Sequence, residues 1–209
     1  MPALVSESLD SLLERIAANT PTPGGGTVSA VCGALSAALS RMVANLAVGK
    51  QGYEAAQSDV AAIEARGRAL QRRFLELAEA DAKAYDVVVA AMRMPKATDA
   101  DRAARKGAMQ DAYRGATEVP METVRAAIEA LELAKSAAEK GNRSAITDAG
   151  VAALLAQAAM RGASLNVRIN LAAVADPLWR EAVEKDLEGL LERGAELAHA
   201  VDDLVRARL

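Results

Sequence analysis

Residues 21–48 read PTPGGGTVSAVCGALSAALSRMVANLAV, and this stretch decides the fold because a Pro/Gly break leads straight into a long run of small apolar residues. Gly24, Gly25 and Gly26 each lose much conformational freedom on folding. A tight turn, a close approach of the backbone to another group, or a ligand must offset that cost. The first N–H groups of the helix that follows lack helical partners, so a carboxylate or phosphate can bind there.

Residues 27–48 are long enough to cross a bilayer and carry one charge, Arg41. Their side chains are mostly small, and both Arg41 and Asn45 are costly in lipid. The pattern therefore favours a helix buried all round, in a core or at a subunit interface, over a membrane span. Because one bundle does not easily cover such a helix, we expect a homodimer.

The rest of the chain alternates helical periodicity with short breaks, and no segment alternates with period two. Ser6 or Ser8 can cap the first helix, Thr98 with Asp101 forms a capping box, and Asp176 precedes Pro177 at a helix start. Pro120 should end or kink its helix near Val119. The expected helices are 4–19, 27–48, 53–92, 99–138, 148–173 and 177–206. The sequence predicts one all-α domain, 1–209, built as a bundle of long antiparallel helices.

Composition narrows the function classes. The net charge of −3 gives no reason to expect a nucleic-acid partner, and only 2% of residues are aromatic, so the core must be Ala, Leu, Val and Met. Cys32 and His199 are the single cysteine and histidine, which excludes a disulfide within the chain and disfavours zinc. Met1–Leu9 lacks the basic start of a signal peptide. We expect a cytoplasmic protein without a metal.

Three breaks carry candidate functional residues. The first is the glycine loop, Pro23–Gly26. In the second, Asp81 and Tyr85 share a helix face and Lys96 follows the end of that helix. In the third region Asn166 and Asn170 also share a face, and uncharged amides on an apolar helix need partners. Each has a structural alternative: a turn, a solvated acid and lysine, or packing against a neighbouring helix end.

Four segments together resemble the formiminotransferase-cyclodeaminase family: residues 21–50, DAKAYDVVVAAMRMPKAT (81–98), GNRSAITDAG (141–150) and GASLNVRINL (162–171). The likeness runs from the glycine loop to about residue 176. Within the family, the chain resembles most specifically the cyclodeaminase half and the stand-alone methenyltetrahydrofolate cyclohydrolases. It implies an all-helical homodimer that acts on tetrahydrofolate derivatives. The positions that it carries over are Pro23, Gly24, Gly25, Gly26, Asp81, Lys96, Asn142, Asp148, Asn166 and Asn170.

The resemblance implies one shared chemistry, a tetrahedral carbon between N5 and N10 of the folate, with no metal or redox cofactor. Asp81 or Asp148 would orient water or take its proton, and Lys96 would donate a proton or stabilise the new oxygen. Asn166 and Asn170 would hold the pterin, and Tyr85 and Asn142 would also bind substrate. A stand-alone chain favours the cyclohydrolase; the alternatives are a formiminotetrahydrofolate cyclodeaminase and a non-enzymatic helical folate-binding or scaffold dimer.

Overall fold

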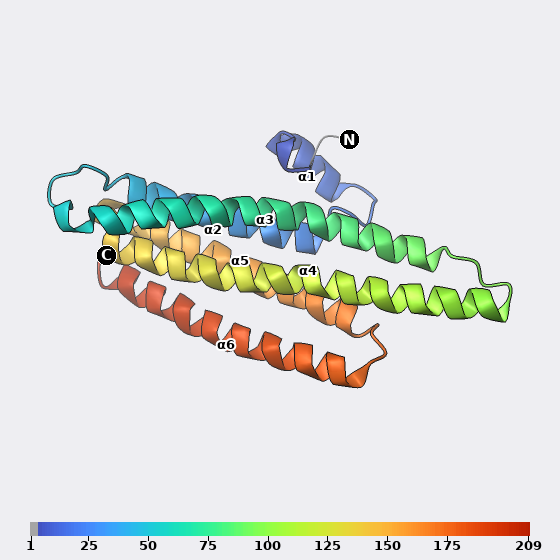
Figure 1. Ribbon diagram of the computed structural model, residues 1–209. Coiled ribbons are helices and arrows are strands. Elements are labelled where there is room, and N and C mark those ends of the chain that lie inside the picture. The colour runs from blue at the N-terminus through green and yellow to red at the C-terminus, as the bar shows by residue number, and fades with distance from the viewer. Residues whose placement is uncertain (1–3) are drawn as a thin grey trace.

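The computed structural model describes residues 4–209 and contains six α-helices and no strand in that range (Figure 1). The helices are α1 (Leu9–Ala17), α2 (Gly25–Asn45), α3 (Gln57–Met92), α4 (Asp99–Lys140), α5 (Ile146–Leu171) and α6 (Pro177–Arg206). The predicted all-α class and the long helices are confirmed. The absence of a leader was predicted partly from residues 1–3, which lie outside the described residues.

Helices that follow one another from α2 to α6 pack side by side, and α2 also packs against α4 and α5. Short connections make successive helices antiparallel, so the core lies among α2, α3, α4 and α5 with α6 outside α4 and α5 (Figure 1). In the same view α1 stands apart from the bundle. The glycine loop and the start of α2 thereby meet the second half of α3 and the last turns of α5.

Small residues allow the helices to approach closely, as the scarcity of aromatic residues predicted. A Cβ on Gly33 of α2 would lie 2.2 Å from the ring of Phe74 of α3, which is fully buried. A Cβ on Gly194 of α6 would lie 2.1 Å from the sulfur of Met160 of α5. The core is therefore a set of large side chains inserted against glycine and alanine backbones.

Helix starts follow the predicted caps. Ser8 caps α1, Thr98 and Asp101 form a capping box on α4, and Asp176 caps α6 with Pro177 at the first position. Of the two outcomes predicted for Pro120, an end of the helix is wrong, because α4 continues through it from Asp99 to Lys140, and a kink stays a prediction. Pro120 is buried, and packing on both sides along this long helix outweighs the loss of one backbone hydrogen bond.

Helix α2 is only partly enclosed within one chain. Residues 25–45 are long and apolar enough to cross a membrane by length and composition, but 56% of the apolar window is buried against the other helices. The outward positions Leu35, Met42 and Leu46 are 51%, 38% and 49% exposed. A single chain thus buries one side of this helix and leaves an apolar side uncovered.

The one charge in α2, Arg41, is neutralised by α3. Its Nη2 and Nε donate to the two carboxylate oxygens of Glu64 at 2.8 and 2.9 Å. Arg68 and Asn45 also donate to Glu64. The hydrogen bonds from Arg41 are the main cause that lowers the pKa of Glu64 from 4.5 to about 2. This pair lets a charged residue lie in an otherwise apolar helix.

Because the pKa of Glu64 is lowered by folding, its ion pair stabilises the fold above pH 4.5 and loses that effect as the pH falls toward about 2. Glu64→Gln should therefore lower the free energy of unfolding by about 1–2 kcal/mol at pH 7. The difference from the wild type should shrink between pH 4.5 and pH 2. Urea denaturation across this range measures it, with the exposed Glu76→Gln on the same helix as control. An equal loss at every pH would contradict this account.

Candidate functional site at the glycine loop

The start of α2 is pressed against Asp81 of α3. A Cβ on Gly26 would lie 2.1 Å from Oδ1 of Asp81 and 2.7 Å from its Oδ2, so no side chain fits at this position. Gly26 is buried, and its backbone forms a wall of the space that holds the carboxylate. The predicted close approach of the glycine loop to another group is therefore made at Gly26, to an acid within the chain.

Thr27 fixes the carboxylate of Asp81. The Thr27 hydroxyl donates to Oδ2 of Asp81 at 3.0 Å, and the Thr27 backbone N–H also bonds to Asp81. Burial raises the pKa of Asp81 above its ordinary 3.8, and the two bonds from Thr27 offset part of that rise. The result is an oriented acid at a helix N-terminus, where the helix dipole favours negative charge.

Gly25 meets α5. A Cβ on Gly25 would lie 3.5 Å from Nδ2 of Asn166, and Nδ2 itself donates to the Gly162 carbonyl at 3.0 Å. Ser29 donates to the Gly25 carbonyl at 2.7 Å, and a Cβ on Gly162 would lie 2.4 Å from the Ser29 hydroxyl oxygen. Gly25 is the first residue of α2, and positive φ angles among glycines of the described chain occur at Gly49 and Gly52, so Gly25 does not need glycine for a left-handed backbone.

The loop before α2 turns back through a cis peptide bond between Thr22 and Pro23. Pro23 is buried and Gly24 is half-buried as the N-cap residue, which has no side chain to cap the helix. Gly25 is exposed. Tyr85 lies one turn after Asp81 on α3 and is 39% exposed. These predicted binding residues surround the start of α2 beside Asp81, and this region is open to solvent at Gly25 and Tyr85.

The three predicted asparagines have different surroundings. Asn170 lies one turn beyond Asn166, and its Nδ2 donates to the Ala116 carbonyl of α4 at 2.6 Å. Asn142 is buried at the other end of α2, where it donates to the Leu46 carbonyl at 2.8 Å and accepts from Ser144. The polar atoms of Asn142 tie the α4–α5 connection to the end of α2. Of the three, Asn166 lies against the glycine loop.

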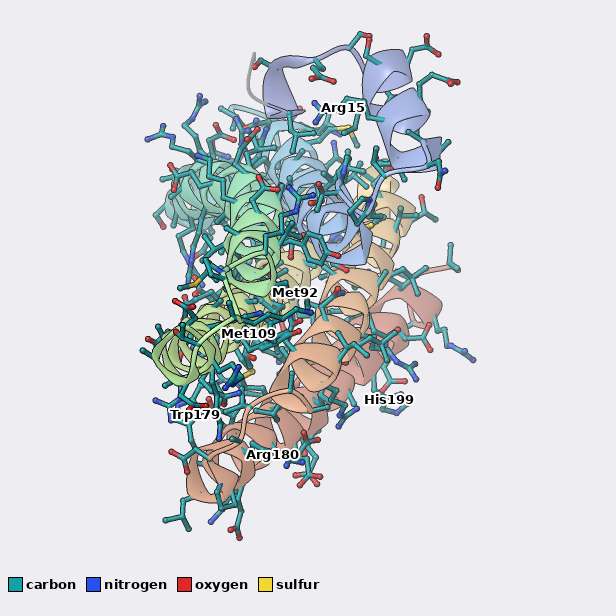
Figure 2. All side chains as sticks on the ribbon, turned by 90° about the vertical axis from the view of Figure 1, so that its right-hand side faces the viewer. Arg15, Met92, Met109, Trp179, Arg180 and His199 are labelled. Atoms are coloured by element: carbon teal, nitrogen blue, oxygen red, sulfur yellow. The ribbon has the colours of Figure 1, made fainter. Side chains whose placement is uncertain are left out.

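The other two candidate catalytic residues are not brought to Asp81 within one chain. Asp148 lies in the first turn of α5, at the end of α2 that is about 30 Å from the glycine loop by the length of α2. Lys96 is exposed in the α3–α4 connection, and about 16 Å of helix separates Asp81 from Met92, where α3 ends. In Figure 2 Met92 and Met109 lie together near that projecting end of the molecule.

Sequence reasoning missed Thr27, Ser29 and Gly162 as parts of this site. A hydroxyl at the third helical position of α2, directly after the glycines, was the available signal for Thr27. Gly162 and Ser29 look like ordinary small residues of buried helices. Only the packing of α2 on α5 shows that they bring Asn166 to Gly25.

Two large grooves lie between α5 and α6, with volumes of about 510 and 570 Å³, and the second is lined in part by Gly162. They share Gln157 and Ala195 and contain none of the predicted site residues. We assign the site from the contacts of Asp81 and not from groove size, because an oriented acid beside a helix N-terminus can do chemistry that a groove alone cannot. Within residues 4–209 no three His, Cys, Asp or Glu residues cluster as a metal site.

The arrangement at the glycine loop suits proton transfer beside a flat ligand. The Asp81 carboxylate can take a proton from water, and its raised pKa makes it a better base than an ordinary aspartate. Asn166 retains an amide oxygen as an acceptor, because only its Nδ2 is bonded in the described structure. Exposed Gly25 leaves room for a ligand to touch backbone.

The sequence model of the formiminotransferase-cyclodeaminase family matches residues 8–189. The chain is 38% identical over 204 residues to a methenyltetrahydrofolate cyclohydrolase of Methylorubrum extorquens, with 98% of each chain covered. It is 30% identical to the formimidoyltransferase-cyclodeaminase of Sus scrofa and spans 38% of that longer protein. A crystal structure of formiminotetrahydrofolate cyclodeaminase from Thermotoga maritima superposes with a TM-score of 0.89 at 28% identity, covering 98% of both chains.

The contact between Gly26 and Asp81 predicts a sharp difference between neighbouring glycines. Gly26→Ala should cost about 1–3 kcal/mol of unfolding free energy, because its Cβ would overlap the carboxylate. Gly25→Ala should stay within about 0.5 kcal/mol, since its Cβ makes an ordinary contact with Asn166. Thermal and urea unfolding measure both, and an Asp81→Ala background should reduce the Gly26→Ala loss. Equal effects of the two substitutions would show that Asp81 does not press on Gly26.

Proposed function

The chain belongs to the formiminotransferase-cyclodeaminase family, and from this premise we propose that it is a methenyltetrahydrofolate cyclohydrolase, which hydrolyses 5,10-methenyltetrahydrofolate to 10-formyltetrahydrofolate. One observation carries the choice: the relative named for this activity is 38% identical over 204 residues, whereas the cyclodeaminase structure is 28% identical over the same share of the chain. The likeness to a cyclodeaminase structure supports the second candidate, formiminotetrahydrofolate cyclodeaminase. Release of ammonia from formiminotetrahydrofolate tests that alternative.

The proposed mechanism centres on Asp81. Water adds to the carbon that bridges N5 and N10, and Asp81 accepts one proton of that water. The tetrahedral carbon then loses its bond to N5, which takes a proton from Asp81. The oxygen keeps its bond to carbon as the formyl group on N10, and its remaining proton leaves to solvent. Thr27 supports this role because its hydroxyl holds Oδ2 of Asp81 in place.

The binding part of the proposal uses the border of the same site. The Asn166 amide oxygen can accept from a pterin N–H, and the backbone at Gly24 and Gly25 lets the ligand approach. Tyr85, one turn beyond Asp81, offers a ring and a hydroxyl to the rest of the folate. Asn170 lies one turn further along α5 and keeps its amide oxygen for the same ligand.

A homodimer is part of the proposal. Helices α2 and α5 pack side by side and carry exposed apolar residues outward: Leu35, Met42, Leu46, Val151, Leu154, Leu165 and Ile169. Such a face is typical of a subunit interface, and a two-fold contact uses the same patch on both copies. With the two-fold axis perpendicular to the helices and centred on this face, that contact would set the glycine loop of one copy toward the partner's Asp148 and Asn142. These predicted residues would then act across the interface.

We propose no cofactor beyond the folate, since one histidine and one cysteine suit an acid–base reaction. We likewise propose a cytoplasmic enzyme on one continuous domain, without a nucleic-acid or membrane partner. The pI near 5.4 is consistent with this assignment. So is the pairing of basic residues with acids, as in Arg68 with Glu64 and Arg73 with Glu122.

Asp81→Asn should lower kcat for methenyltetrahydrofolate about 10²- to 10⁴-fold, because the amide keeps the shape but cannot take a proton. Asp86→Asn, an exposed acid on the same helix, is the matched control and should stay within about threefold. Loss of methenyltetrahydrofolate absorbance gives the rate, and circular dichroism checks the fold. A normal kcat in Asp81→Asn would remove Asp81 from the chemistry.

Lys96→Met separates two roles for this lysine. Stabilisation of the new oxygen would make kcat fall about 10²- to 10³-fold. The length of α3 between Asp81 and the α3–α4 connection instead favours a contact with the far, anionic end of the folate, and we expect a higher KM with little change in kcat. Steady-state kinetics at several folate concentrations distinguishes them. A fall in kcat alone would return Lys96 to the reacting centre.

A further inference from the structure

Helix α1 is an amphipathic helix that its own chain does not cover. Leu9 and Leu13 are 70% and 54% exposed, Leu12 and Ile16 are half-buried, and α1 buries none of its residues fully. A nine-residue helix is marginal alone in water, so an apolar face of this kind needs a packing surface.

The position of α1 indicates which surface its apolar face can pack against. Figure 2 shows α1, which carries Arg15, on the side of α2 away from α3, above the flank where α5 lies. Leu35 and Met42 of α2 are exposed and lie, by helical spacing, opposite Gly33, which packs on α3, so the apolar side of α2 faces this flank. The helix therefore projects over the face that we propose as the dimer interface, with its own apolar residues uncovered.

We propose that α1 is an arm that packs onto a second copy of this chain, against the partner's end of the α2–α5 face that holds Leu46, Val48 and Val151. The inference rests on the proposed two-fold dimer. In the dimer that we propose, the two-fold axis runs across the helices, so the glycine-loop end of one copy, from which α1 extends, lies opposite the other end of its partner. Leu46, Val48 and Val151 are 49%, 58% and 45% exposed, and they match Leu9 and Leu13 in kind.

Charge favours the same pairing. Asp10 and Glu14 lie four residues apart on α1, and both are exposed without an ion pair in the described part of the chain. At the other end of the face, Lys50 and Arg143 are exposed cations, and both residues contact Tyr53. The Lys50 ammonium lies 5.8 Å from the centre of the Tyr53 ring, and the Arg143 backbone N–H donates to the Tyr53 hydroxyl. Acids on the arm would meet bases on the partner.

The arm cannot reach this end of its own chain. Helix α2 separates the two places by about 30 Å, whereas α1 itself is about 14 Å long. Residues 18–24 join α1 directly to the glycine loop, so an arm held by the partner would also hold Gly24 and Gly25. Dimer formation and the shape of the site are thereby linked through this connection.

Cross-linking tests the contact directly. In a Cys32→Ser background, Leu13→Cys with Val48→Cys should give a covalent dimer on oxidation, seen on a non-reducing gel. Leu13→Cys with Ala100→Cys, whose second cysteine lies in the exposed first turn of α4, is the control and should stay uncrosslinked. A protein that is dimeric by light scattering, with no cross-link for the first pair, would overturn the arm. A monomer would overturn both the arm and the dimer.

A charge exchange gives an independent result. Glu14→Lys and Arg143→Glu should each raise the dimer dissociation constant about tenfold, and the chain with both should recover most of the loss. Because the two residues lie at opposite ends of α2, recovery requires contact between copies. Additive losses would contradict the proposal. Turnover of methenyltetrahydrofolate, measured separately, shows whether the proposed function holds when the arm does not.

Discussion

The packing of the α2 N-terminus on Asp81 is the constraint on which the site depends. Only glycine at position 26 lets the backbone lie against the Asp81 carboxylate, because a Cβ there would be 2.1 Å from Oδ1. Thr27 then supplies the hydroxyl that fixes the acid. Burial under the start of α2 raises the pKa of Asp81, while the two bonds from Thr27 offset part of that rise, so the packing of this helix also sets the acid's chemistry.

Small residues along α2 extend this constraint through the bundle. Gly33 admits the Phe74 ring from α3, and one turn earlier on α2 Ser29 lies against Gly162 of α5. These contacts set the depth at which α2 lies between α3 and α5. They bring Asp81 and Asn166, which are far apart in sequence, to the two sides of one glycine loop. The outward side of α2 stays apolar and uncovered, which is why we propose a second copy there.

Much of the fold followed from the sequence because its signals are local. The caps at Ser8, Thr98 and Asp176 set helix starts with their own hydrogen bonds. The helix end predicted at Pro120 was wrong because packing of a long helix, which is not local, outweighs one missing bond. The site was predictable only in part. Asp81 and Tyr85 share a helix face by spacing alone, whereas the separation of Asp148 and Asn142 from the glycine loop depends on how α2 and α5 run past one another.

The central claim is that folate binds at the glycine loop with its reacting carbon beside Asp81. A crystal structure with a bound methenyltetrahydrofolate analogue tests it most directly. The account predicts the bridging carbon within about 3–4 Å of the Asp81 carboxylate, or one water away, with the pterin against Gly25 and Asn166. A folate bound in the α5–α6 groove around Gln157 and Ala195, away from Asp81, would contradict it.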